Sequence, residues 1–140
     1  MVDVSDKSST IRVATVRGVV RLTAAHMAAL DELPKGDAIT TAQIAGIQGG
    51  KKASELIQLC HPIALSKLDV RIARVDQGLE ILATAKTNAV TGVEMEAYSA
   101  VVVAGITLID MLKGVNPDLT LTDVQLLEKT GGKADWVRKR

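Results

Sequence analysis

A run of apolar residues at positions 97–109 limits the possible folds of this 140-residue chain more than any other feature. In a helix, its valine, isoleucine and leucine side chains would point in most directions around the axis. One face can then pack on a sheet, while another stays exposed in a single chain, and such exposed apolar faces usually mark interfaces. The run therefore predicts a central helix over about residues 93–113 and a homo-oligomer assembled around it.

Ionisable residues stand at both ends of this predicted helix. Glu94 and Glu96 flank Met95 at its start, and Asp110 and Lys113 lie near its end. Positions 94 and 96 differ by about 200° around a helix, so the two glutamates do not form a simple carboxylate pair. Glu96 and Asp110 return to nearly the same face but lie about 21 Å apart along the axis. A small-molecule site that uses both ends is therefore expected to be shared between subunits.

Charge and composition exclude several classes of function. The 17 Lys and Arg residues nearly balance 16 Asp and Glu, and Tyr98 and Trp136 are the aromatic residues, so no nucleic-acid surface is indicated. Cys60 has no disulfide partner, and with His26 and His61 it supplies too few ligands for structural zinc. The N-terminus lacks a signal pattern, and the apolar run is shorter than the about 20 residues that cross a bilayer. We expect a cytoplasmic protein that binds neither nucleic acids nor membranes.

Four stretches have the alternation or the valine content of strands. They cover residues 12–22, 67–73, 79–87 and about 119–127. Asp76-Gln77-Gly78 predicts a hairpin turn between the second and third strands, and Gly18 predicts a bulge in the first.

Helical patterns fill the segment between the first two strands. Thr23 is a suitable N-cap for a short helix over residues 24–30. Residues 39–59 are predicted to be helical in two pieces, separated at Gly49-Gly50. The apolar face of these pieces would carry Ile44, Ile47, Leu56 and Ile57.

The order strand, helices, strand, strand, helix, strand is the split βαβ pattern of ferredoxin-like folds. We therefore predict one α+β domain over residues 1–140, with an antiparallel sheet covered by helices. Its basic C-terminal end, residues 130–140, is expected to be a flexible tail.

Asp110 and Lys113 are candidates for acid–base chemistry. Asp110 and Lys113 are three positions apart and therefore neighbours on one helix face. They can form a surface ion pair that complements the helix dipole, or an acid–base pair in which the carboxylate tunes the ammonium. Lys35 lies in a predicted turn, Pro34-Lys35-Gly36-Asp37, where lysines are usually solvated.

Two further segments carry candidate binding groups. His61 lies between Cys60 and Pro62, where it can bond backbone or act as a general acid or base, while the cysteine suits a small buried hydrophobe. Lys129 precedes Thr130-Gly131-Gly132-Lys133. Glycines flanked by lysines can hold phosphate through backbone N–H groups, but the spacing is not that of a Walker A loop, so this indication is weak.

Taken together, these segments resemble the C-protein family of molybdenum cofactor biosynthesis, the cyclic pyranopterin monophosphate synthases. The Leu-Cys-His-Pro and Gly-Val-Glu-Met-Glu stretches are the most specific, and the matches run in order over nearly the whole chain. The matching stretches are residues 1–5, 35–37, 42–48, 59–62, 65–67, 91–97, 110–113 and 129–133.

The resemblance implies a ferredoxin-like enzyme, assembled as a hexamer of three dimers with active sites at dimer interfaces. Its substrate would be a cyclised dihydro-GTP, and its products cyclic pyranopterin monophosphate and pyrophosphate. No cofactor is implied, although magnesium can accompany the triphosphate. The catalytic residues of the family match Lys35, Asp110, Lys113 and Lys129. Its substrate-binding residues match Arg12, Cys60, His61, Glu94, Met95 and Glu96.

A second interpretation is a non-catalytic regulatory oligomer of the same fold that binds a nucleotide or pterin. Such a protein would need the basic loop and the interface but no acid–base cluster. Asp110 and Lys113 discriminate between the two, because a pure binding protein has little use for a coupled pair at a helix end.

Overall fold

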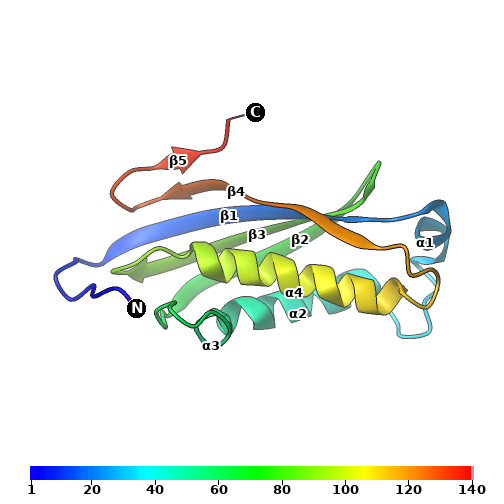
Figure 1. Ribbon diagram of the computed structural model, residues 1–140, viewed down its shortest axis with the longest axis horizontal. Helices are drawn as coiled ribbons and strands as arrows, with labels where there is room; N and C mark the ends of the chain where they lie inside the picture. Colours follow the sequence, from blue (N-terminus) through cyan, green and yellow to red (C-terminus); the bar gives the residue numbers. More distant parts are fainter. Residues whose placement is uncertain (140) are drawn as a thin grey trace.

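The computed structural model describes residues 1–139 and shows a sheet with helices packed on one side (Figure 1). The strands are β1 (Thr10–Arg21), β2 (Leu65–Val75), β3 (Gly78–Ala89), β4 (Thr120–Thr130) and β5 (Trp136–Val137). The helices are α1 (Ala24–Ala29), α2 (Ala38–Lys51), α3 (Ala53–Leu56) and α4 (Glu94–Leu112). The predicted α+β class with an antiparallel sheet is confirmed.

The strands lie in the order β2-β3-β1-β4-β5, and each neighbouring pair is antiparallel. The predicted irregularity at Gly18 is present, because the β1–β4 register shifts between Arg17 and Val19. Across the shift, Asp123 has a φ of 53°, in the left-handed region. A Cβ atom at position 18 would lie 2.7 Å from Cγ1 of Val101, so glycine also lets α4 lie close to the sheet.

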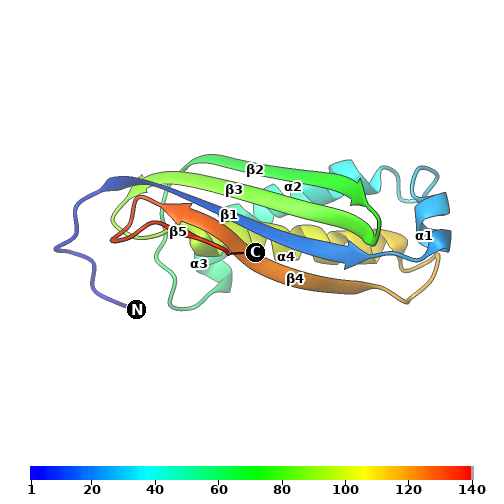
Figure 2. The same ribbon diagram turned by 90° about the horizontal axis from the view of Figure 1, so that it is seen from above.

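Helices α2 and α4 lie side by side beneath the sheet, and α4 is the central element of the core (Figure 2). The predicted helix over about 93–113 is confirmed at nearly its full length. Its fully buried side chains pack with Val16 and Val20 of β1 and with Leu79 and Ile81 of β3. The small and medium residues that α4 buries are Ala97, Ala100, Val101, Ala104 and Leu108.

The predicted division of residues 39–59 into two helices is confirmed, but the break lies at Lys52 and not at Gly49-Gly50. Helix α2 continues through both glycines and ends at Lys51. A Cβ atom at position 49 would lie 2.6 Å from the Val103 side chain, and one at position 50 would lie 2.9 Å from the carbonyl oxygen of Glu96. Both glycines therefore serve the close contact between α2 and α4, and the packing of the two helices overrides the low helix propensity of glycine.

The predicted apolar face of this helical segment is wrong. Ile44 is 59% exposed, Leu56 is 57% exposed and Ile57 is exposed as well, whereas Ile47 packs against the core. Small residues make the buried face instead, since they allow the two helix axes to approach. They are Ala38, Ala42, Gly46, Gly49 and Gly50.

The sequence predicts an apolar run too short to cross a bilayer, but the length of α4 does not exclude a membrane span. The helix has 19 residues, and by length and composition alone it could cross a bilayer. More than half of its most apolar window is buried inside the protein. The burial of α4 in the core, rather than its length, is what argues for a helix of a soluble domain.

The C-terminal segment adds a strand that the sequence pattern does not indicate. Strand β5 pairs with β4, with Lys129 opposite Trp136 and Glu128 opposite Val137. The flexibility expected of residues 130–140 stays a prediction, and Arg140 lies outside the described residues.

Candidate functional site

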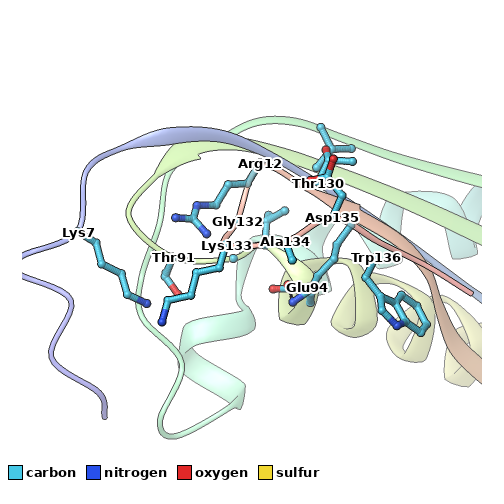
Figure 3. Close-up of a pocket in the computed structure, with 14 residues that line it drawn as sticks. Lys7, Arg12, Thr91, Glu94, Thr130, Gly132, Lys133, Ala134, Asp135 and Trp136 are labelled. Atoms are coloured by element: carbon cyan, nitrogen blue, oxygen red, sulfur yellow. Dashed lines mark ion pairs between the residues drawn. The ribbon is translucent and has the colours of Figure 1, made fainter.

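A cavity of about 510 Å³ lies where β4 ends and α4 begins (Figure 3). Arg12 reaches it from β1, Glu94 from the first turn of α4 and Lys129 from the end of β4. Its other lining residues come from the N-terminal segment, the loop before α4, the end of β4, the loop that follows it, and β5. They include Lys7, Thr91, Gly92, Thr130, Gly132, Lys133, Asp135 and Trp136.

The cavity is a cationic site. Four basic side chains line it, from Lys7, Arg12, Lys129 and Lys133, against the carboxylates of Glu94 and Asp135. The Lys129 ammonium lies 3.1 Å from Oε1 of Glu94, and both side chains are partly exposed. The Arg12 guanidinium is held in place because it donates hydrogen bonds to the carbonyls of Ala89 (3.1 Å) and Val90 (3.2 Å). An excess of positive charge in a concave site favours an anionic ligand.

The loop Thr130-Gly131-Gly132-Lys133, the glycine loop, is held by hydrogen bonds and by a backbone conformation that requires glycine. Gly131 has a φ of +88°, and a side chain there would overlap the carbonyl oxygen of Ile11. Its N–H donates to Oδ1 of Asp135 (3.1 Å), and the Thr10 hydroxyl donates to its carbonyl (2.7 Å). The Gly131 amide is therefore already bonded within the loop, and Gly132 lines the cavity together with Lys129, Thr130 and Lys133.

Glu94 and Glu96 diverge, as helix geometry predicts. Glu94 faces the cavity, Met95 is partly exposed between the two glutamates, and Glu96 is only 4% exposed. Burial raises the pKa of the Glu96 carboxyl, and the nearby charge of Glu94 adds to that effect. Within residues 1–139, its Oε2 atom is buried without a hydrogen-bond partner. A buried polar atom without a partner is costly and rare in native proteins, so Glu96 stays a candidate binding residue.

Cys60 and His61 lie in the loop that follows α3. Nε2 of His61 donates to the carbonyl oxygen of Val2 at 2.7 Å, which agrees with the interpretation as a backbone-bonding histidine. The Cys60 thiol lies 3.7 Å from the His61 carbonyl oxygen. Burial, and then the charge of Glu96, raise the pKa of this thiol, so it is poorly suited to act as a nucleophile.

Lys35, Asp110 and Lys113 form a second group, the lysine–aspartate cluster, at the far end of α4. Oδ2 of Asp110 lies 2.8 Å from Nζ of Lys35, and Oδ1 lies 2.9 Å from Nζ of Lys113. The Lys35 ammonium also donates to the Asp110 backbone carbonyl at 3.3 Å. Hydrogen bonds from Lys35 and then Lys113 lower the pKa of Asp110 from 3.8 to about 2. One carboxylate therefore orients two ammonium groups, all of them half-exposed.

The titration of Asp110 tests this arrangement. Its pKa is depressed in the folded protein, so its stabilising contribution is complete above 3.8 and is lost as the pH falls toward about 2. In a carbon-detected NMR titration we expect the Asp110 carboxyl to titrate near 2, and to return toward 3.8 in a Lys35→Ala, Lys113→Ala double variant. A wild-type midpoint at the ordinary aspartate value would contradict the geometry of the cluster.

One chain does not bring all the predicted site residues together. Glu94 and Asp110 are 16 positions apart on α4, which places them about 24 Å apart along the helix axis. Lys129, which the resemblance groups with Lys35 and Lys113 as a catalytic residue, lies at the cavity and away from both. The three lysines therefore do not come together within a single chain.

Several residues that line the cavity are not predicted by any sequence pattern. Lys7, Asp135 and Trp136 face the cavity, but their segments lack the periodic patterns that identify elements. The isolated tryptophan in a chain nearly free of aromatic residues was the available indication. Within residues 1–139, no group of three or more His, Cys, Asp or Glu side chains is placed to hold a metal ion.

The fold and the two groups of ionisable residues define an α+β protein with a cationic cavity and a lysine–aspartate cluster. Residues 1–132 match the MoaC family, and the chain belongs to that family. The resemblance found in the sequence is confirmed, and with it the expectation of an enzyme rather than a purely regulatory binding protein.

Close relatives carry one name. A cyclic pyranopterin monophosphate synthase of Streptomyces avermitilis is 49% identical over 141 residues, which cover 99% of this chain and 83% of that protein. Proteins of the same name from Corynebacterium efficiens and Oleidesulfovibrio alaskensis are 48% and 50% identical. Those alignments cover 97% and 99% of this chain, and 90% and 89% of the two relatives.

Proposed function

We propose that this protein is a cyclic pyranopterin monophosphate synthase of molybdenum cofactor biosynthesis. It converts a cyclised dihydro-GTP to cyclic pyranopterin monophosphate and releases pyrophosphate. Family membership and the names of the relatives support this activity. The observation that carries the chemistry is the Asp110 carboxylate, which lies within 3 Å of the ammonium groups of both Lys35 and Lys113.

The lysine–aspartate cluster supports proton transfer during ring opening and pterin formation. With a pKa of about 2, Asp110 is ionised at neutral pH and acts as an acceptor that holds the lysines, not as a proton donor. The Lys35 and Lys113 ammonium groups are then the proton donors of the cluster. Each ammonium can donate a proton to the substrate once its bond to Asp110 is exchanged for one to the substrate, and the neutral amine that remains can then take a proton back.

The cationic cavity supports binding and cleavage of the triphosphate. Closure of the cyclic phosphate requires attack of a substrate hydroxyl on the α-phosphorus, with loss of that hydroxyl proton and cleavage of the bond to the β-phosphate. The pyrophosphate that leaves carries the displaced electron pair, and Lys129 and Arg12 stabilise its charge. Magnesium, where it takes part, arrives with the triphosphate, and no redox cofactor is required because no step changes oxidation state.

The remaining matched residues would bind the guanine-derived ring. Glu94 lies in the cavity, and the unpaired Oε2 of Glu96 is suited to accept a hydrogen bond from ring N–H groups. Cys60, His61 and Met95 do not line the cavity within one chain, and the resemblance alone assigns them to ring binding. The ring edge of a guanine derivative carries N–H donors, so carboxylates are appropriate partners for it.

The cavity and the lysine–aspartate cluster are two half-sites of one active site, and they would meet across a subunit interface. Met95, Val102 and Ile106 leave an exposed apolar face along α4, between the cavity and the lysine–aspartate cluster. The exposure of this apolar face supports a homo-oligomer in which a second chain covers it, and the resemblance implies a trimer of dimers. The strand order β4-β1-β3-β2 supports the ferredoxin-like class, and the enzyme would be cytoplasmic.

Direct turnover tests the proposed function. The purified protein is incubated with the cyclised dihydro-GTP precursor, and cyclic pyranopterin monophosphate and pyrophosphate are quantified in the same sample. We expect equal amounts of the two products to form. Consumption of the precursor without pyrophosphate release, or no consumption by a folded oligomer, would contradict the proposal. GTP itself, which lacks the additional ring, serves as the control substrate and should yield neither product.

A further inference from the structure

Trp136 is a cavity residue to which neither the family match over residues 1–132 nor the mechanism above assigns a role. It is the single tryptophan of the chain, and its side chain is 40% exposed. The other aromatic residue, Tyr98, packs against the core, and its hydroxyl accepts a hydrogen bond from the Leu126 N–H at 3.0 Å. Trp136 therefore supplies the aromatic surface of a cavity whose other side chains are mostly polar or charged.

Strand β5 fixes the position of this side chain. Trp136 stands directly opposite Lys129 in the antiparallel β4–β5 pair, and directly opposite residues project on the same face. Lys129 reaches Glu94 at 3.1 Å, so the indole projects toward the same region at the start of α4. In Figure 3 the indole lies on the opposite side of Glu94 from Lys7 and Lys133.

Arg138 holds the indole in place. Its guanidinium carbon lies 5.4 Å from the ring centroid, a cation–π distance, and its Nε donates to the Leu126 carbonyl at 2.8 Å. The Arg138 N–H also donates to the Leu127 carbonyl at 2.7 Å. A ring anchored in this way loses little conformational freedom when a ligand binds, which favours its use as a contact surface.

We propose that Trp136 is a substrate-contacting residue on which the planar ring of the guanine-derived triphosphate stacks. Lys7, Arg12 and Lys133 bind the polyphosphate on one side of Glu94, and the indole on the other side stacks on the ring. The volume of about 510 Å³ lies within the range of small-molecule sites. This inference rests on the proposed function, because that function supplies a ligand that has both a heterocycle and a triphosphate.

Two probes separate ring stacking from phosphate binding. GTP carries a guanine ring and a triphosphate, and inorganic tripolyphosphate carries the phosphates alone. By titration calorimetry of the full chain, we expect Trp136→Leu to weaken GTP binding by roughly 5- to 150-fold, the effect of losing one stacked base. Tripolyphosphate affinity should change less than about twofold, which also shows that the cavity of the variant is intact. In the wild-type protein, GTP should quench the fluorescence of the single tryptophan more than tripolyphosphate does at saturation.

A matched control lies on the same strand. Val137 is 64% exposed and does not line this cavity, so Val137→Ala should leave both affinities unchanged, while Trp136→Phe should retain most of the GTP affinity. Equal weakening of both probes by Trp136→Leu, no weakening of either, or no wild-type preference for GTP would overturn the inference. Precursor turnover by the wild-type enzyme is measured separately. A failure of stacking with intact turnover would leave the proposed function standing, and absent turnover would refute that function whatever the binding results.

Discussion

Replacement of Asp110 with asparagine is expected to lower kcat for the cyclised precursor by about 100- to 10,000-fold, the range for loss of a positioned acid–base group. The asparagine side chain has nearly the same shape but no charge. It would release the ammonium groups that Asp110 holds at 2.8 and 2.9 Å. Lys113→Ala should cause a loss in the same range, because it removes one of the two proton donors. Steady-state rates of product formation provide the measurement.

A second exposed ion pair in the same chain supplies the control. Asp31 pairs with Arg74 at 2.6 Å, also near the surface, but lies in neither the cavity nor the lysine–aspartate cluster. Asp31→Asn should therefore leave kcat unchanged. Mass measurement in solution verifies that all variants assemble like the wild type. Near wild-type rates in correctly assembled Asp110→Asn and Lys113→Ala proteins would remove these residues from the mechanism.

Activity should reappear when two inactive variants with changes at opposite ends of α4 are mixed. Lys113→Ala removes part of the lysine–aspartate cluster, and Lys129→Ala removes part of the cavity, about 24 Å away along the helix. If each site takes one end from each of two chains, random mixing in equal amounts restores about a quarter of the sites. The variants are unfolded and refolded together, or co-expressed, and the recovered rate is compared with that of the wild type.

The matched control for this mixing experiment uses two changes within one cluster. Lys113→Ala mixed with Asp110→Ala should regain no activity, because both changes fall in the same half-site wherever the chains meet. Recovery in this control would indicate simple restabilisation of a weak oligomer. Absence of recovery in the Lys113→Ala and Lys129→Ala mixture would mean that each site is built from a single chain.

The features that depend on local periodicity could be predicted from the sequence. The alternation in β2 and β3, the turn between them and the buried helix α4 all follow from patterns within one segment. The divergence of Glu94 and Glu96 follows from helix geometry alone. The N-cap at Thr23 is likewise local, since its hydroxyl accepts a hydrogen bond from the His26 N–H within the same turn.

The features that depend on contacts between distant segments could not be predicted from local patterns. Gly49 and Gly50 resemble a helix break in sequence, and only the contact with Val103 and the Glu96 carbonyl explains why α2 continues. Lys35 resembles a solvated turn residue, yet it lies 2.8 Å from Asp110, 75 positions further along the chain. Strand β5 is too short to have a periodic pattern, and it forms because β4 offers an edge for pairing.

The antiparallel contact between α2 and α4 holds the two half-sites of one chain at a fixed distance from each other. Helix α2 starts at Ala38, just after Lys35 in the lysine–aspartate cluster, and near its other end Gly50 lies against the Glu96 carbonyl. A change of register between these helices would displace both half-sites at once, because no flexible segment of α2 separates their anchoring points. The glycine contacts thus fix the distance, within one chain, between the lysine–aspartate cluster and the Glu94 end of α4, and every subunit of an assembly would share that distance.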